Sequence, residues 1–331
     1  MGMLVRGAWT EDDGATRVKD GEFDHIPVAF RSFITRDGSS GFGAERDRYH
    51  LYVAKGCPWA HRALIFRRLK KLEEIVSLTL ITGPRSQGFC AADGNPHVVP
   101  GSDKSVLHLH EVYALANPAY TGRVTVPVLW DKKRRTIVNN ESSEVIRMFN
   151  SEFAGLAEPS TDYYPADLRD EIDRLNTLIY ENVNNGVYKA GFSPSQPAYE
   201  KAYDNLFDAF DVLEERLSRK RYLCGDRITE ADWRLFPTLL RFDTIYHYAF
   251  KCNKRHLYQY PNLWGLCREL YQMPGISELC FLEDAKRGYY SNPAINPLGT
   301  VPKGPLIDFN EPHGRERLGA AGAVGAPRAV A

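Results

Sequence analysis

The spacing of apolar residues changes character near residue 150. Before that point, the apolar runs at 49–54 and 75–81 have the length of strands, and residues 58–72 between them repeat apolar side chains at helical spacing. Because strand, helix and strand follow one another closely, this stretch predicts a βαβ unit with parallel strands. Two further apolar runs, at 124–130 and 136–138, predict two more strands of the same domain.

After residue 159 the pattern is helical. Pro159 and Pro165 enclose a polar stretch that predicts a linker. Thr229, followed three residues later by Asp232, forms a capping-box pattern that marks a helix start. The predicted fold class is therefore α/β plus all-α, a small sheet domain followed by a helical domain. The apolar spacing predicts four helices in the second domain, at 166–186, 197–219, 229–250 and 262–272.

Composition and pattern together predict four parts. Residues 1–45 are polar and weakly patterned, which predicts an extension, and residues 46–158 and 159–306 are the sheet and helical domains. The Gly/Ala-rich end at 307–331 predicts a disordered tail. Within the sheet domain, residues 83–120 form a long irregular stretch, of a length that is uncommon unless it is functional.

Pro127 interrupts an apolar run that otherwise predicts a strand. Proline cannot donate a ladder hydrogen bond, so it is either an ordinary edge residue or follows a cis bond from Val126, and we expect the cis bond. The acidic and hydroxyl residues that begin at Glu141 and Ser142 suit the first turn of a helix.

The charge balance argues against several classes of partner. The chain has 331 residues with 42 basic and 42 acidic side chains, so neither nucleic acid nor an anionic membrane surface is expected as its main partner. No apolar run is long enough to span a membrane, and the N-terminus lacks the apolar core of a signal peptide. We therefore expect a cytoplasmic protein.

The six cysteines and the histidine pair His108 and His110 do not predict a metal site. The cysteines are scattered without close pairs, so neither a disulfide framework nor a zinc site is expected. His108 and His110 have strand-like spacing and no cysteine or carboxylate cluster beside them. Four cysteines occur among apolar residues of expected helices and are interpreted as core or surface filler: Cys224, Cys252, Cys267 and Cys280.

Cys57 stands directly between the first strand and the first helix. A cysteine at a helix N-terminus lies among free backbone N–H groups, which favour the thiolate. Pro58 suits the first helical position, because its missing N–H costs nothing there. Ala60 stands where redox motifs of this kind carry a second cysteine, so the implied chemistry is that of a single thiol whose adduct an outside thiol removes.

His61 follows Cys57 by four residues, on the same helical face. It could support the thiolate. Alternatively it belongs to a solvated basic face of the helix, together with Arg62, Arg67 and Arg68.

Five segments of the chain carry a resemblance to a known family: 55–62, 122–131, 137–144, 184–192 and 295–305. Together they resemble the glutathione transferase architecture, a thioredoxin-like domain followed by a helical domain. Within it they resemble the xi class, the glutathionyl-hydroquinone reductases. The resemblance implies an enzyme that uses glutathione, needs no metal, flavin or nicotinamide, and forms a homodimer. No G-x-G-x-x-G motif follows any predicted strand, which agrees with the expected lack of a nicotinamide.

The resemblance assigns roles on the glutathione side of the site. Cys57 would attack the sulfur of an aromatic glutathione thioether, and a second glutathione would then release oxidised glutathione from the mixed disulfide. Val126, ahead of Pro127, would pair its backbone with the cysteinyl part of glutathione. Glu141 and Ser142 would hold the γ-glutamyl end at a helix N-terminus, or simply cap that helix.

Arg123 and Phe89 complete the expected glutathione contacts. Arg123 would pair with the glycyl carboxylate or lie as an ordinary residue on a strand surface. The family has Gly-Trp-x-Phe in the loop after the second βαβ strand, and its Trp packs on glutathione. This chain has Ser-Gln-Gly-Phe-Cys at 86–90, so Phe89 would replace the Trp with weaker stacking and lower glutathione affinity.

Tyrosines are concentrated in the helical domain, which contains fourteen of the 18. That is more than packing needs, since a buried hydroxyl must find a partner. The resemblance assigns Tyr188 and one of Tyr289 or Tyr290 to the hydroquinone ring, with Tyr188 and Tyr289 as the catalytic pair. The family's His-Tyr-Tyr-Gly-Ser-His reads Gly-Tyr-Tyr-Ser-Asn at 288–292, one residue shorter, which leaves the substrate preference open.

Two other functions remain open from the sequence. One is a general omega-like thioltransferase or dehydroascorbate reductase of the same fold, and the other is a non-catalytic ligand-binding protein. A conjugating transferase is disfavoured, because it needs a Tyr or Ser hydroxyl to activate glutathione, whereas a cysteine traps glutathione as a disulfide.

Overall fold

The computed structural model describes residues 2–11, 18–19, 22–23, 28–81, 87–90 and 95–318. The chain divides into two compact units. The first comprises Met1–Asp162 and Glu278–Tyr289, and the second comprises Tyr163–Ser277 and Tyr290–Ala331. The segment Glu278–Tyr289, near the C-terminus, thus belongs to the first unit. The domain boundaries expected from the sequence place this segment in the helical domain.

A four-stranded sheet forms the centre of the first unit. Its strand order is β11-β10-β5-β6, with β5 and β6 parallel and the other neighbours antiparallel. The predicted βαβ unit is confirmed, with helix α1 between its two strands. The elements are β5 (Tyr49–Ala54), α1 (Pro58–Leu69), β6 (Val76–Ile81), β10 (Val128–Asp131) and β11 (Thr136–Asn139).

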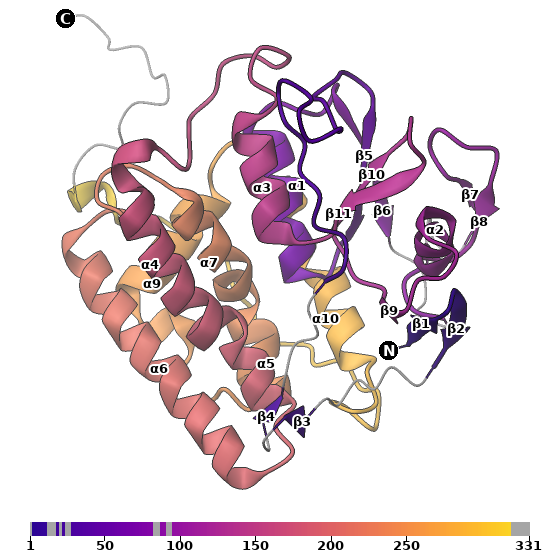
Figure 1. Cartoon of the computed structure of the whole chain (residues 1–331). Helices are drawn as coiled ribbons and strands as arrows, with labels where there is room; N and C mark the ends of the chain where they lie inside the picture. The colour runs from indigo at the N-terminus through magenta and orange to yellow at the C-terminus, as the bar shows by residue number, and fades with distance from the viewer. Residues whose placement is uncertain are drawn as a thin grey trace, which may run out of the picture. The chain divides into compact units, whose positions relative to one another are not determined.

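Helices cover both faces of this sheet. α1 packs with α3 (Ser142–Ser151) on one face, and α2 (Leu109–Ala116) lies on the other (Figure 1). α2 falls in the stretch expected to be irregular, so that expectation and the strand-like interpretation of His108 and His110 are wrong. His108 begins α2 instead, because its side chain and that of Glu111 form a reciprocal capping box.

The N-terminal extension contains strands. β1 and β2 form a hairpin, and β1 also pairs with β9, so the first ten residues become part of the first unit. Part of the extension predicted over residues 1–45 thus contributes two strands to a three-stranded sheet. The short strands are β1 (Met3–Val5), β2 (Ala8–Thr10), β3 (Val18–Lys19), β4 (Glu22–Phe23), β7 (His97–Val98), β8 (Ser105–Val106) and β9 (Gly122–Arg123).

β5 is buried along its whole length, including a histidine. The ring nitrogens of His50 lie 2.8 Å from Ser77 Oγ and 2.9 Å from Thr79 Oγ1, so both find partners on the neighbouring strand β6. Burial, with nearby Lys132, lowers the pKa of His50 to about 3. The core of the first unit thus holds a neutral imidazole.

The second unit is helical, as predicted. The expected helices over 166–186 and 229–250 are each interrupted by a π-helical turn, η3 (Tyr180–Asn184) and η4 (Phe242–Tyr246). The α-helices are α4 (Arg169–Ile179), α5 (Gly186–Gly191), α6 (Gln196–Arg219), α7 (Glu230–Arg241), α8 (His247–Ala249) and α9 (Pro261–Tyr271). Short 3-10 turns occur at η2 (Ala166–Leu168), η5 (Leu257–Gln259), η6 (Ser277–Leu279) and η7 (Glu316–Leu318).

The capping box predicted at the start of α7 is confirmed. Asp232 accepts hydrogen bonds from Thr229 N at 2.9 Å and from Leu223 N at 2.8 Å. Because the carboxyl is fully buried, its pKa is raised to about 6, although these bonds oppose the shift.

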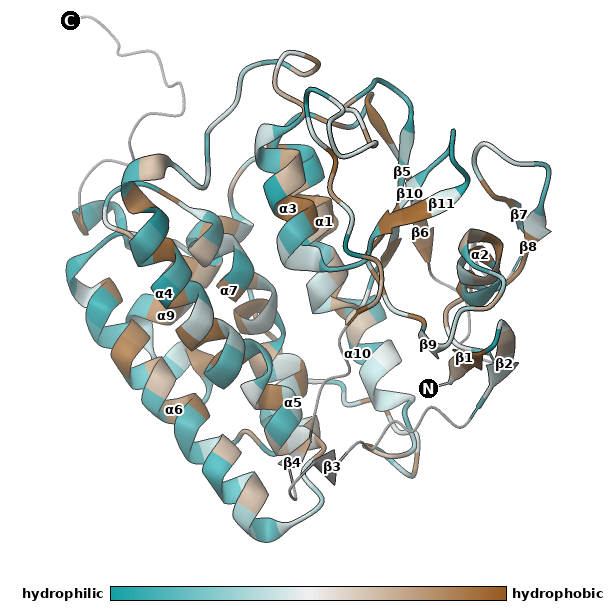
Figure 2. Cartoon of the chain, in the orientation of Figure 1, coloured by the Kyte–Doolittle hydropathy of each residue, from teal (hydrophilic) through white to brown (hydrophobic). Residues whose placement is uncertain are grey.

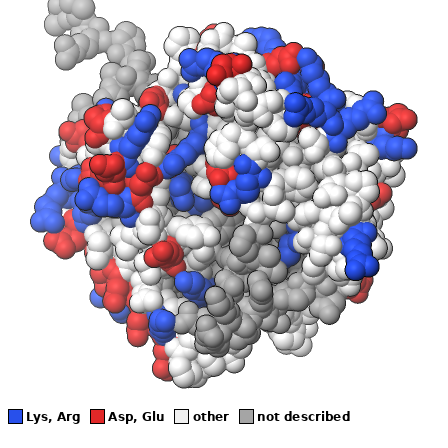
Figure 3. All heavy atoms as spheres, in the orientation of Figure 1, with Lys and Arg blue, Asp and Glu red and all other residues white. Residues whose placement is uncertain are grey.

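α6 has two different faces. Figure 2 shows hydrophilic and hydrophobic residues alternating along its length, as expected for a helix with one buried side. Acidic and basic side chains intermingle on the face shown in Figure 3, and Glu171 of α4 pairs with Arg216 and Lys220 beside α6. A shallow groove of about 530 Å³ lies between these helices, and no residue predicted for the active site lines it.

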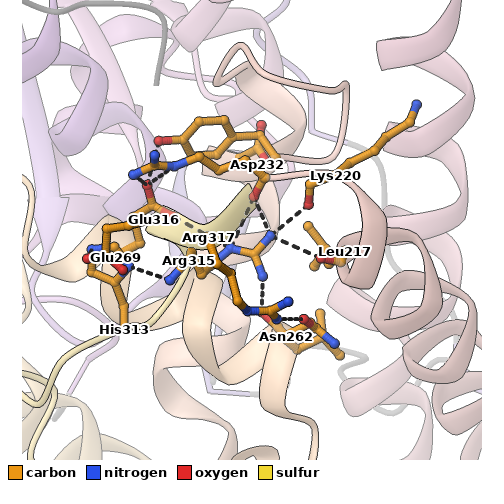
Figure 4. A network of polar contacts seen from close by, with 12 residues as sticks. Leu217, Lys220, Asp232, Asn262, Glu269, His313, Arg315, Glu316 and Arg317 are labelled. Carbon is orange, nitrogen blue, oxygen red and sulfur yellow. Dashed lines mark hydrogen bonds and ion pairs between the residues drawn. The ribbon is translucent and has the colours of Figure 1, made fainter. Parts of the chain in front are cut away.

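The segment expected to begin a disordered tail is partly ordered, so that expectation is wrong for residues 307–318; residues 319–331 lie outside the described part. The reason is Arg315, whose side chain is only 1 % exposed. Figure 4 shows its guanidinium donating to carbonyl oxygens at the end of α6 and the start of α9. The acceptors are Leu217, Lys220, Arg221 and Asn262.

No helix in the described part of the chain is long and apolar enough to cross a membrane.

Candidate active site

Cys57 lies where β5 turns into α1. Its backbone is extended (φ −79°, ψ 121°), and it occupies the N-cap position with Pro58 as the first helical residue. The Cys57 N–H donates to Ala54 O at 3.0 Å, which closes the turn. The thiol is half-exposed, whereas Cys90, Cys224, Cys252 and Cys267 are buried. The geometry therefore offers a reachable sulfur at the positive end of a helix.

Val126 lies beside this thiol although it is 69 residues away in the chain. The Cys57 Sγ is 3.9 Å from the Val126 carbonyl oxygen. The sheet explains the proximity, because β10 runs antiparallel to β5 with Val128 opposite Tyr52. The predicted cis bond between Val126 and Pro127 is confirmed.

Glu141 and Ser142 form the start of α3. Glu141 is the N-cap and accepts from Ser143 N at 3.0 Å and Ser143 Oγ at 2.8 Å, so the capping role considered from the sequence is confirmed. Ser142 is buried, and its hydroxyl accepts from Arg62 Nη1 at 3.4 Å. Hydroxyl, guanidinium and helix N-terminus together suit a carboxylate group.

The basic face expected on α1 is wrong for two of its members. His61 is 2 % exposed, and Arg62 is also buried, with its guanidinium 4.7 Å from the centre of the Trp59 ring. The His61 Nε2 lies 3.9 Å from Cys280 Sγ. Cys280 is half-exposed and comes from the C-terminal segment of the first unit, so of the two interpretations, core or surface filler, it fits the surface one.

The same segment continues as α10 (Leu282–Tyr290), a helix that the sequence pattern did not predict. It packs closely on the turn that carries Cys57. A side chain at Gly56 would place its Cβ 3.2 Å from Ala285 Cα, so glycine permits this approach. Tyr289 lies half-exposed on the last turn of α10, whereas Tyr290 is 1 % exposed.

Arg123 and Phe89 are both held in place by main-chain hydrogen bonds. Arg123 pairs with Met3 as part of β9, and its carbonyl accepts from Tyr120 Oη at 2.9 Å. The Phe89 carbonyl accepts from Leu109 N at 2.9 Å, at the entrance to α2. Both side chains are half-exposed, and their roles toward glutathione stay predictions.

Tyr188 belongs to an aromatic cluster in the second unit. Its ring centre is 5.5 Å from that of Phe250, 6.1 Å from Tyr246 and 6.3 Å from Phe192. Tyr188 itself is half-exposed. In the same unit the Tyr290 hydroxyl donates to Thr244 O at 3.2 Å, and burial raises the pKa of Tyr290 to about 12.

The sequence pattern missed three features near the predicted residues. Arg62 gave no signal beyond a basic run, and the α10 packing on Gly56 connects residues more than 200 positions apart. The π-helical turn η4 lies within an uninterrupted apolar pattern, so no periodicity could reveal it. Among the described residues no cluster of His, Cys, Asp and Glu could hold a metal ion.

Comparisons with known proteins cover both units. Residues 56–152 match the glutathione S-transferase N-terminal domain family, and residues 196–269 match the C-terminal domain family. The chain is 46 % identical over 327 residues to the glutathionyl-hydroquinone reductase YqjG of Escherichia coli, covering 96 % of this chain and 99 % of that protein. It is also 46 % identical over 306 residues to the glutathionyl-hydroquinone reductase PcpF of Sphingobium chlorophenolicum, covering 92 % and 96 %.

Solved structures agree with this match. The glutathione-bound structure of YqjG superposes with a TM-score of 0.82, covering 88 % of this chain and 98 % of that one at 46 % identity. The Xi class glutathione transferase of Natrialba magadii gives a TM-score of 0.87 at 40 % identity, covering 96 % and 97 %. The predicted architecture, a thioredoxin-like domain followed by a helical transferase domain, is confirmed.

Proposed function

The chain belongs to the xi class of glutathione transferases, the glutathionyl-hydroquinone reductases, and we propose that it frees hydroquinones from their glutathione thioethers through Cys57. The observation that carries the proposal is the half-exposed Cys57 thiol at the N-terminus of α1, 3.9 Å from the Val126 carbonyl. Ala60 provides no second thiol in the turn, so the chemistry needs glutathione as the partner thiol.

In the first half-reaction the Cys57 thiolate attacks the sulfur of the thioether. A Cys57–glutathione disulfide forms and the bond from sulfur to the ring carbon breaks. The electron pair of that bond stays on the ring, which takes up one proton and leaves as the hydroquinone.

In the second half-reaction a glutathione thiolate attacks the glutathione sulfur of the mixed disulfide. Oxidised glutathione leaves, and the Cys57 thiolate is restored. Overall, one thioether, one glutathione thiolate and one proton give one hydroquinone and one molecule of oxidised glutathione, while the Cys57 thiolate is regenerated. The two sulfurs supply both electrons.

The glutathione moiety would be held along the first unit. Val126 supports this with a carbonyl beside the thiol, and Ser142 with a hydroxyl next to Arg62 at the start of α3. Glu141 uses Oε1 to cap α3, which leaves Oε2 for the γ-glutamyl ammonium group. Arg123 is proposed for the glycyl carboxylate, and Phe89 and Pro127 complete the contacts.

The aromatic ring would meet tyrosine hydroxyls. We assign Tyr188 and Tyr289 as the donors to the phenol oxygen, where they stabilise the departing phenolate. Tyr290 is less suited as a donor to the ring, because its hydroxyl already donates to Thr244 O. It contributes by packing within the second unit.

The test is reduction of glutathionyl-menadiol with excess glutathione, comparing wild type with Cys57→Ser. We expect a loss of at least about a thousandfold in turnover, because a serine hydroxyl cannot form the mixed disulfide. Cys280→Ser is the matched control, since it removes the other half-exposed thiol, and it should keep the mixed disulfide at Cys57. Turnover that survives in Cys57→Ser would contradict the proposal.

One departure favours a second candidate function. Phe89 stands where the family has Trp, so a wild type that is inactive on several aromatic thioethers but still forms Cys57–glutathione would be a general thioltransferase. We also propose a homodimer in the cytoplasm, and sedimentation equilibrium of the purified chain tests the dimer.

A further inference from the structure

The π-helical turn η4 contacts Tyr188, which is assigned to the aromatic ring, and Tyr290, which is assigned a packing role. Tyr246, its last residue, packs on Tyr188 with 6.1 Å between ring centres. Two residues earlier, the Thr244 carbonyl accepts the Tyr290 hydroxyl at 3.2 Å. Tyr289 is the chain neighbour of Tyr290 on the final turn of α10. The contacts that fix the conformation of this turn therefore also position Tyr188 and Tyr290.

Asp243, inside the turn, is a buried and incompletely satisfied carboxyl group. It is 4 % exposed, and its Oδ1 accepts from Leu257 N at 2.6 Å and lies 3.5 Å from His256 Nδ1. Its Oδ2 is buried and has no hydrogen-bond partner within the described ranges. Burial raises the pKa of the Asp243 carboxyl, opposed by the Leu257 N–H and by His256. Such groups are costly to bury and are typical of functional sites.

His256, which faces Asp243, lies in a stack of three rings. The His247 ring is 3.7 Å away and the Tyr258 ring 4.9 Å away, centre to centre, and both are nearly parallel to it. His247 directly follows η4 in the chain. Burial, with His256 nearby, lowers the pKa of His247.

The other charged groups around the turn have other contacts. Arg255 lies 3.9 Å from Asp211, and its guanidinium is 5.5 Å from the centre of the Tyr260 ring. Lys254 lies over the Phe207 ring at 5.6 Å. Arg241, just before the turn, donates to Pro237 O at 3.0 Å. Among the described residues, the basic side chain that faces Asp243 is thus His256.

We propose that Asp243 is a positioning residue for the aromatic half of the active site. Paired with His256, it sets the π-helical turn that holds Tyr188 and Tyr290. The proposal rests on the proposed function, because the tyrosines matter only if the ring of the thioether binds to them. π-helical turns occur often at functional sites, and here the turn presents one carbonyl and one ring to different tyrosines.

The two half-reactions separate a positioning role from a structural one. Hydroquinone release needs the tyrosines, whereas attack of glutathione on Cys57–glutathione does not. Asp243→Asn keeps the size and the acceptor for Leu257 N but removes the negative charge. Asp211→Asn is the matched control, since Asp211 is an exposed carboxylate of the same unit.

Both half-reactions are followed in single turnovers with glutathionyl-menadiol. We expect Asp243→Asn to slow hydroquinone release about tenfold and glutathione attack less than about twofold, since small displacements of positioning groups slow chemistry strongly. Asp211→Asn should change neither. Equal rates in wild type and Asp243→Asn, or equal slowing of both half-reactions, would overturn the proposal.

A second variant gives an independent check. His256→Gln leaves Asp243 in place and should slow hydroquinone release about threefold, with little effect on glutathione attack. Equal rates of hydroquinone release in wild type and His256→Gln would count against the pairing.

Failure of the proposed function can be distinguished from failure of the positioning role of Asp243. If the proposed function is wrong, wild type and Asp243→Asn both release no hydroquinone. Amide hydrogen exchange then decides the positioning role: faster exchange of residues 186–192 in Asp243→Asn supports it, and unchanged exchange overturns it.

Discussion

The glutathione side and the aromatic side of the candidate site are built in different ways. On the glutathione side, Cys57 and Glu141 each occupy the N-cap of a helix, and the thiol lies 3.9 Å from the main-chain carbonyl oxygen of Val126. On the aromatic side, the Tyr188 ring packs on Tyr246 of a π-helical turn, and the Tyr290 hydroxyl donates to the Thr244 carbonyl of the same turn. Groups placed by helix starts leave local motifs in a sequence, whereas groups placed by side-chain packing do not.

The two units also bury opposite kinds of titratable group. The sheet unit holds His50 as a neutral imidazole, and the helical unit holds Asp232 and Asp243 as buried carboxyl groups. Acid therefore acts on the two units in opposite directions. The predictions below test whether the units behave as differently as their interiors suggest.

The largest expected effect concerns the C-terminal anchor of the helical unit. Arg315→Met keeps the aliphatic stem but leaves the carbonyls of Lys220 and Asn262 without this donor. It also removes one of two arginines near Glu269. We expect the second unit to lose about 3 kcal/mol of unfolding free energy, and the first unit to be unaffected. Amide hydrogen exchange measured by mass spectrometry separates the units.

Arg317→Met is the control for this change. Arg317 is exposed and donates to the Asn262 side chain at 2.9 Å, so its loss should cost less than about 0.5 kcal/mol. Equal losses in both units from Arg315→Met would show that the anchor does not act within the helical unit alone.

Acid should weaken the first unit through His50. Its folded pKa of about 3 lies below the usual histidine pKa of 6.5, so the unfolded state binds the proton first, and stability present above pH 6.5 is lost as pH falls toward 3. Between pH 7 and 4.5 the His50 contribution falls by roughly 2–3 kcal/mol. Hydrogen exchange of β5 and β6 over this range measures it. His50→Asn should flatten the dependence.

Acid should strengthen the second unit through Asp232. Its folded pKa of about 6 lies above the usual aspartate pKa of 3.8, so the folded state binds the proton first, and stability rises as pH falls from 6 toward 3.8. Between pH 7 and 4.5 this contribution should gain roughly 2 kcal/mol, read from hydrogen exchange of α7. A slope for α7 that is the same in Asp232→Asn as in wild type would contradict this assignment.

The smallest effect tests the glutathione side. Phe89→Trp restores the residue that the family carries in this loop, with a larger ring and an indole N–H. We expect the KM for glutathione to fall about twofold to fivefold, with hydroquinone release in a single turnover unchanged. Steady-state kinetics at varied glutathione measure this, with Phe89→Leu as the control that should raise the KM.

The sequence by itself determined those parts of the protein that depend on residues a few positions apart. The βαβ unit, the cysteine at the start of α1 and the capping box of Thr229 and Asp232 follow from periodicity and turn chemistry within one or two turns. The order of sheet domain and helical domain follows from the same local signals. The resemblance to the xi class supplied the expected reaction, because its motifs include the starts of α1 and α3, where Cys57 and Glu141 lie.

Only the tertiary structure decided which side chains are buried and which distant segments meet. His61 and Arg62, on an apparently basic face, are buried because other elements cover them, and α10 joins the first unit by packing on Gly56. Arg315 orders a segment of disordered composition because it reaches carbonyls nearly a hundred residues away. Such contacts depend on the free energy of packing and burial between distant segments, which no local pattern contains.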